Sequence, residues 1–176
     1  MSIKIRSIVV LFLATISTIV GTAQINRTLE TKVVDLLAQL PTEDLEHADR
    51  LMQEAIELGE DGILEFTSRL VPAGEGNDSQ VRYFVHNLAT YAGRGETVPA
   101  NNVVEGALQK AIDDSKDPEV KTFLMERLAF CGTESSVEFL SAFLEEEDYY
   151  KTALAVLTTI GSESAGRMIL LSLIHI

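Results

Sequence analysis

Four segments of this chain share one pattern, and each of them ends in glycine. These Gly-terminated segments span residues 44–59, 78–93, 117–132 and 146–161, and they align with one another without a gap. An acidic residue opens each segment. Apolar residues then recur at intervals of about three and four, which is the spacing of one helix face. Four aligned glycines indicate an internal repeat, and a repeat of this length limits the fold more than any other feature of the sequence.

Start and stop signals of a helix are present in these segments as well. Asp78 and Asp117 stand where an N-cap side chain accepts hydrogen bonds from the free N–H groups of a first turn. Pro118 follows at the first helical position, where its missing N–H costs nothing. The glycine that ends each segment, such as Gly132, predicts a left-handed C-cap. The sequence therefore predicts one helix in each segment.

A second, more variable helical stretch follows each of the four glycines. These stretches lie at residues 60–70, 102–112, 133–143 and 162–171, and residues 24–40 supply a first partner helix. A unit is therefore predicted to be two antiparallel helices, repeated every 29 to 39 residues. Because the sequence has no strand-like alternation longer than a few residues, the expected fold class is all-α.

This pattern resembles the HEAT-repeat family. The resemblance is carried by the Asp-x-x-Val-Arg/Lys starts at residues 78–82 and 117–121, two apolar turns, the glycine and a second amphipathic helix. The unit between Gly132 and Gly161 is most similar to the short HEAT-like repeats of the phycobilisome-lyase type, and the resemblance covers residues 42–171. It implies a right-handed α-solenoid of antiparallel helix pairs, an armadillo-type superhelix. Such repeats serve many functions, so the resemblance says little about this one.

The first residues have the layout of a secretory signal peptide. Basic residues precede an uncharged apolar run at residues 8–20, and small residues then stand before a cleavage site at Gln24. The run is shorter than the ~20 residues that a membrane-spanning helix needs. We expect residues 1–23 to be removed and residues 24–171 to form the helical repeat domain. The mature protein is then a periplasmic or secreted bacterial protein, without membrane contact after cleavage.

The end of the chain is apolar, and no further helix follows it. A solenoid normally ends in a capping unit with a polar outer face. The sequence therefore predicts an N-terminal fragment of a longer protein, with a truncated tail at residues 172–176. It also predicts self-association of copies through this open C-terminal end.

Charge and reactive side chains exclude several classes of function. A formal net charge of −13 repels phosphate, so we expect no nucleic-acid partner.

The single cysteine, Cys131, aligns with apolar residues and is expected in the core. His47 and His86 also align with apolar residues, and no two histidines have the i, i+4 spacing of a metal site. Acidic runs at residues 113–117 and 145–148 are interpreted as solvated turns, with Ca²⁺ capture as the alternative. We expect no catalytic residue, no cofactor and no metal ion.

One surface stripe is a candidate interaction surface. Tyr83, Asn87 and Tyr91 fall at positions i, i+4 and i+8 of the second Gly-terminated segment, next to Thr90. Aromatic rings beside an amide can stack on sugars or peptides. In the alternative interpretation, both tyrosines only fill space between units.

The expected function is a non-catalytic exported scaffold that binds a protein, peptide or glycan on a curved surface of equivalent helices. An alternative of another class is an N-terminal accessory repeat region of a larger secreted enzyme, for example a carbohydrate-active one. A third interpretation, a bilin lyase, follows from the resemblance alone. The export signal argues against it, because that chemistry is cytosolic.

Overall fold

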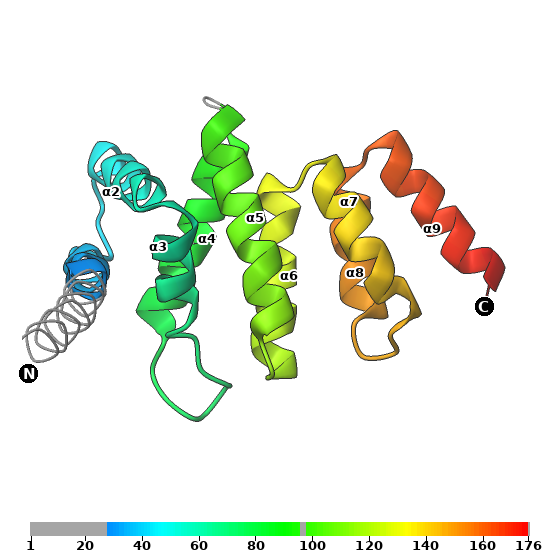
Figure 1. Ribbon diagram of the computed structural model, residues 1–176, viewed down its shortest axis with the longest axis horizontal. Coiled ribbons are helices and arrows are strands. Elements are labelled where there is room, and N and C mark those ends of the chain that lie inside the picture. Colours follow the sequence, from blue (N-terminus) through cyan, green and yellow to red (C-terminus); the bar gives the residue numbers. More distant parts are fainter. Residues whose placement is uncertain (1–27, 96–97, 176) are drawn as a thin grey trace, which may run out of the picture.

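The computed structural model describes residues 28–95 and 98–175, and these residues form only helices, turns and loops (Figure 1). The all-α class is therefore confirmed for the described residues, while the predicted signal peptide at residues 1–23 lies outside them. A helix over residues 28–37 comes first. It is followed by α2 (Leu45–Glu57), α3 (Gly59–Thr67), α4 (Ser79–Gly93), α5 (Val98–Asp114), α6 (Pro118–Cys131), α7 (Glu134–Ser141), the 3-10 helix η1 (Ala142–Glu145), α8 (Tyr150–Ile160) and α9 (Glu163–His175).

The predicted helices correspond to the observed ones. The four Gly-terminated segments contain α2, α4, α6 and α8, and the more variable stretches overlap α3, α5, α7 and α9, of which α5 and α9 extend several residues beyond the predicted bounds. α5 begins at Val98, before the predicted start at Asn102. α8 begins at Tyr150, later than predicted, because Glu146 is extended and its carbonyl oxygen accepts hydrogen bonds from the N–H groups of Tyr149 and Tyr150.

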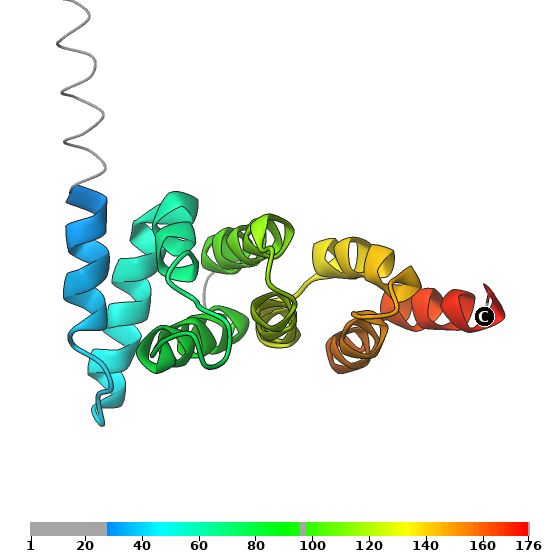
Figure 2. The same cartoon turned by 90° about the horizontal axis from the view of Figure 1, so that it is seen from below.

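The helices are arranged in two layers (Figure 2). α2, α4, α6 and α8 contact one another in that order and form one layer, and α3, α5, α7 and α9 form the other. α4 and α6 run in the same direction, as the contacts between residues at equivalent positions indicate. Arg82 near the start of α4 pairs with Glu119 near the start of α6, and Gly93 at the end of α4 lies against Phe130 near the end of α6.

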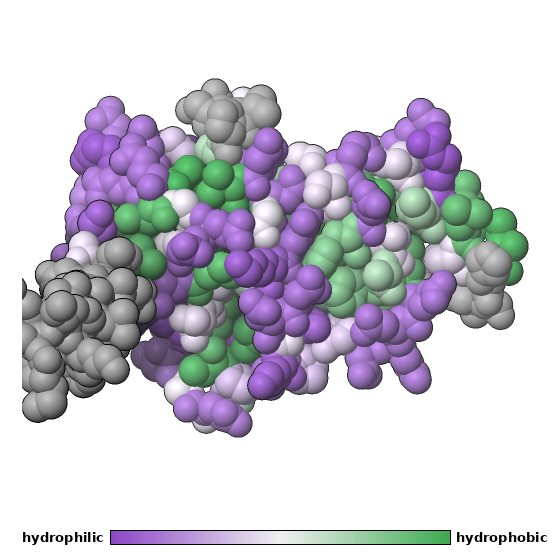
Figure 3. Space-filling view, viewed as in Figure 1, coloured by the Kyte–Doolittle hydropathy of each residue, from purple (hydrophilic) through white to green (hydrophobic). Residues whose placement is uncertain are grey.

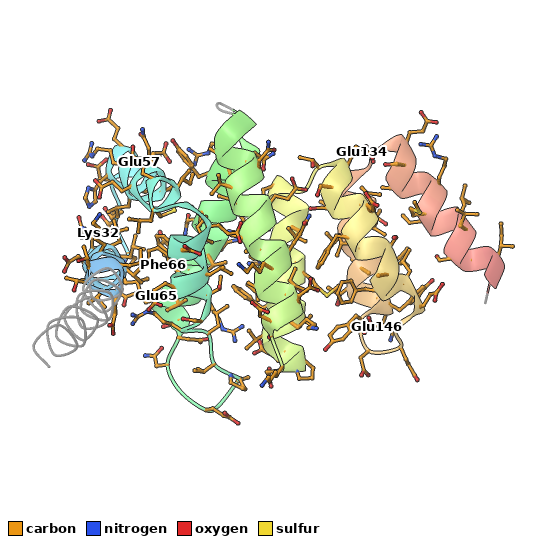
Figure 4. All side chains as sticks on the ribbon, viewed as in Figure 1. Lys32, Glu57, Glu65, Phe66, Glu134 and Glu146 are labelled. Carbon is orange, nitrogen blue, oxygen red and sulfur yellow. The ribbon has the colours of Figure 1, made fainter. Side chains whose placement is uncertain are left out.

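One hydrophobic core runs between the layers through the described part of the chain. Phe66 of α3, labelled in Figure 4, stacks on Phe84 of α4 with ring centroids 4.0 Å apart. Cys131 is buried in this core, as the sequence predicts. Burial raises the pKa of its thiol to about 12, and the nearby charge of Glu105 adds to this effect. A thiol of this kind is protonated and inert at neutral pH.

A buried carboxylate joins α5 to α7. Glu105 of α5 is only 3% exposed. Its Oε1 atom accepts hydrogen bonds from the N–H groups of Thr133, at 2.8 Å, and of Ser136, at 2.9 Å, and both hydroxyl groups donate to it too. These N–H groups belong to the first turn of α7, which has no helical partner for them. Glu105 therefore caps α7 from a neighbouring helix.

The predicted aspartate caps are confirmed at one of their two positions. Asp117 Oδ1 accepts hydrogen bonds from the N–H groups of Glu119 and Val120, both at 3.0 Å. The prediction for Asp78 is wrong, because its side chain makes no cap hydrogen bond. Its carboxylate instead accepts from the N–H of Val71 and from Nε of Arg82. The Arg82 guanidinium thus competes with the N–H groups of the first turn for this carboxylate, and these contacts connect the loop before α4 to the helix.

The glycines that end the segments have two different roles. Gly59 and Gly161 have φ angles of 72° and 64°, the left-handed conformation that the sequence predicts. Gly132 does not, since its φ is −66° and its ψ is 137°. A Cβ atom on Gly132 would lie 2.6 Å from the carbonyl oxygen of Leu128 and 2.9 Å from Cδ1 of Ile160. Glycine is therefore favoured there mainly by the close carbonyl oxygen of α6, with the end of the Ile160 side chain of α8 beside it, and the predicted left-handed cap is wrong for this position.

Gly93 departs from the predicted cap in the same way. It is the last residue of α4, and it is not among the glycines with positive φ. A Cβ atom built on it would overlap the carbonyl oxygen of Phe130 and lie 2.8 Å from the carbonyl carbon of that residue. At this point α4 and α6 are in backbone contact.

Candidate interaction surface

The predicted stripe lies along α4, and its polar groups are already engaged. Tyr83 is 39% exposed, whereas Asn87 and Thr90 are half-buried. The Asn87 amide nitrogen donates a hydrogen bond to the carbonyl oxygen of Tyr83 at 2.7 Å, and the Thr90 hydroxyl donates to that of His86 at 2.9 Å. The Thr90 hydroxyl proton and one of the two Asn87 amide protons are therefore engaged within α4.

Tyr91 belongs to a contact between α4 and α2. Its ring is half-buried against the core, and the guanidinium carbon of Arg94 lies 5.6 Å from the ring centroid. Arg94 in turn donates to both carboxylate oxygens of Asp49 at 2.8 Å. Tyr83 is in a different environment, where it lines a cavity of about 460 Å³ beside Pro41. The structure therefore separates the two tyrosines that the sequence groups together.

A second set of side chains, not predicted as a site from the sequence, lies between α4 and α6. We call it the α4–α6 seam, and it consists of Arg82, His86, Phe123, Arg127 and Phe130. The guanidinium carbons of Arg82 and Arg127 each lie 4.7 Å from the centroid of the Phe123 ring, and that of Arg127 lies 5.6 Å from the Phe130 ring. Cations over aromatic faces at these distances attract the rings electrostatically.

At one end of the seam, Arg82 is held in place by ion pairs and hydrogen bonds. Its Nη1 and Nη2 atoms donate to the two carboxylate oxygens of Glu119 at 2.7 Å, and Nη2 also donates to the carbonyl oxygen of Val71 at 2.9 Å. The hydrogen bond to Glu119 is the largest of the effects that raise the pKa of Arg82 above its ordinary value. Two carboxylates, those of Asp78 and Glu119, offset the charge of this guanidinium.

Arg127 is less completely paired. Its Nη1 atom lies 3.2 Å from Nδ1 of His86, and its Nη2 atom donates to the Glu126 carboxylate at 3.1 Å. Its Nε atom is buried and has no hydrogen-bond partner among the described residues. Burial lowers the pKa of Arg127, and burial together with the Arg127 charge lowers the pKa of His86. His86 is therefore neutral at pH 7, with Nδ1 accepting from Arg127.

Phe130 is the exposed end of the seam. It is 44% exposed, although it is a large apolar side chain. The His86 ring meets it edge-on, with centroids 5.0 Å apart and an interplanar angle of 88°, and the Arg127 guanidinium lies over it. An exposed ring held by two neighbours loses little side-chain entropy on binding. Aromatic and arginine side chains are also enriched at the energetic centres of protein interfaces.

Metal ligation and membrane crossing have no support in the described part of the chain. Within residues 28–95 and 98–175, no three side chains among histidine, cysteine, aspartate and glutamate are placed to hold a metal ion. Over the same residues, no helix combines the length and the apolar character needed to cross a bilayer.

The described residues thus define an all-helical, two-layer protein with a cationic and aromatic seam in one layer. No protein-family model, no curated protein and no solved structure matches this chain significantly. Its function is therefore inferred from its own residues.

Proposed function

We propose that this chain is a non-catalytic interaction scaffold of the HEAT-repeat type, exported from a bacterium and built as a right-handed α-solenoid. The alternation of helices between two layers supports the solenoid, since each layer receives one helix from every unit. The chain binds its partner on the face of α4 and α6. In this proposal residues 1–23 direct export, so the partner is met in the periplasm or outside the cell.

The observation that carries the proposal is the exposed Phe130 ring, held between His86 and Arg127. A protein or peptide segment fits this surface best, because it can cover the ring and accept a hydrogen bond from Arg127. A glycan partner fits less well, because the two tyrosines of the predicted stripe lie in different environments and one amide proton of Asn87 is engaged within α4. In the alternative function, the same surface docks onto the catalytic domain of a larger secreted enzyme.

The partner is expected to contact position 130 directly. A photo-crosslinking residue in place of Phe130 should form a covalent adduct with the partner in cells that export the chain. Glu138 is the control position, because it is exposed on α7 in the other layer. In a titration with the purified partner, Phe130→Ala should weaken binding at least about tenfold, as truncation of an interface hot spot does.

Two outcomes would contradict this assignment of the binding face. One is equal crosslinking from positions 130 and 138, which would indicate unselective collision. The other is an unchanged affinity of Phe130→Ala for a partner captured at position 130. A thermal unfolding curve of the variant separates a binding defect from a folding defect.

We also propose that copies of the chain associate through α9. One side of this helix is buried at Ala165, whereas Leu170, Leu171, Leu173 and Ile174 are exposed, and Figure 3 shows this apolar surface at the C-terminal edge. Light scattering should therefore find oligomers of the mature chain. Leu173→Glu should shift them towards monomer, whereas Thr159→Glu, on the exposed surface of α8, should not. A monodisperse monomer for the unmodified chain would refute this association.

A further inference from the structure

A cavity of about 480 Å³ lies where the C-terminal ends of α3 and α5 meet the start of α6. Sites for small ligands have volumes of this order. Figure 3 shows apolar surface between the lower ends of α3 and α5, bordered by hydrophilic residues. The apolar wall of the cavity consists of Leu64, Leu70, Pro72, Ala111, Val120 and Leu124.

Hydroxyl groups at the rim of this cavity are turned away from a ligand. The Thr67 hydroxyl donates to the carbonyl oxygen of Leu64, and the Ser115 hydroxyl donates to that of Asp117. Ser68 is engaged in the same way with the carbonyl oxygen of Glu65. The rim therefore has few donors to offer to an anionic or carbonyl-bearing ligand.

The charged groups at the rim favour a cation. The rim carries the carboxylates of Asp114 and Asp117 and one ammonium group, that of Lys116. The formal net charge of −13 adds an attractive long-range field for cations. A comparable cavity of about 390 Å³, between the helix over residues 28–37 and α2, carries Lys32 and three carboxylates, including that of Glu57, but it has less apolar wall to hold the body of a ligand (Figure 4).

We propose that the cavity between α3, α5 and α6 binds a small organic cation, namely an apolar body that carries one ammonium group. The apolar body lies against Leu70, Ala111 and Leu124, and the ammonium group lies at the rim beside Asp114 and Asp117. None of the seam residues lines this cavity. The site is therefore independent of the proposed partner-binding face on α4 and α6.

Three probes of equal chain length test the charge selection. Calorimetry and ligand-observed NMR on the purified protein should detect binding of hexylammonium and weaker binding of 1-hexanol. Hexanoate should bind at least about tenfold more weakly than hexylammonium, because its charge meets the two carboxylates. Affinity should rise from butylammonium to hexylammonium, since the longer chain covers more of the apolar wall.

A matched pair of variants tests the location. Asp114→Asn should weaken hexylammonium binding at least about threefold, whereas Asp113→Asn should leave it unchanged. Both residues are exposed at the end of α5 and both changes remove one charge, but only Asp114 lines the cavity. Equal effects of the two variants, equal binding of hexanoate, or no binding of hexylammonium at millimolar concentration would each overturn the proposal.

Discussion

Replacing Gly93 with alanine is expected to lower the free energy of unfolding by about 3 kcal/mol or more. The added Cβ atom would overlap the carbonyl oxygen of Phe130 and lie 3.5 Å from the Cα atom of Cys131. These are backbone atoms of α6, so they cannot move aside as the end of a flexible side chain can. Urea unfolding followed by far-UV circular dichroism measures the loss.

The control for this variant is Gly106→Ala in α5. A Cβ atom on Gly106 would have nothing within 4 Å, and its helix gains from alanine at an interior position. We expect Gly106→Ala to be neutral or to stabilise the protein by up to about 1 kcal/mol. If the two alanine variants unfold at the same urea concentration, the backbone contact between α4 and α6 is not present in solution.

Glu105→Gln is expected to cost about 1–3 kcal/mol of stability. The glutamine oxygen can keep the N–H groups of Thr133 and Ser136 at the position of Oε1, but a neutral oxygen accepts these hydrogen bonds less strongly than a carboxylate does. The amide nitrogen takes the place of Oε2, and it cannot accept the hydrogen bond that the Thr133 hydroxyl donates there. Urea unfolding again gives the loss of free energy.

Thiol labelling adds a local measurement to this variant. Cys131 is buried beside Glu105 with its pKa raised to about 12, so an alkylating reagent should reach it only after local opening. Labelling at pH 8 should be faster in Glu105→Gln than in Glu138→Gln, which changes an exposed carboxylate of α7. Equal stability and equal labelling in the two variants would refute the capping role of Glu105.

Helix positions could be predicted from this sequence because the same pattern occurs four times. Each copy supports the others, so the helix after Glu146 could be predicted although Glu146 is a weak helix N-cap. The predictions for individual helix caps were wrong where a contact from another element competes with a local preference. The Asp78 carboxylate accepts from the N–H of Val71 in the preceding loop as well as from Arg82. A Cβ atom on Gly132 would meet the Leu128 carbonyl oxygen and the end of the Ile160 side chain of α8.

The seam could not be predicted from the alignment, because the contacts that join α4 to α6 involve residues of different segments. His86 and Arg127, for example, meet only once α4 and α6 lie side by side. A partial signal is present on α6, where Phe123, Arg127 and Phe130 fall at positions i, i+4 and i+7 of one face. Glu105 also carries a signal, since it is a charge on the otherwise apolar face of α5.

The contact at Gly93 also affects the geometry of the surface between α4 and α6. α4 and α6 touch backbone to backbone at this end, whereas the Arg82 and Phe123 side chains stand between them at the other end. Because α4 and α6 are in backbone contact at one end and are spaced by side chains at the other, the distance between the two helices increases along their length. The approach of α8 to Gly132 is different, because the nearest α8 atom to an added Cβ is Cδ1 of the Ile160 side chain and not a backbone atom. The absence of a side chain at position 93 thus sets how closely α4 and α6 approach each other beside Phe130.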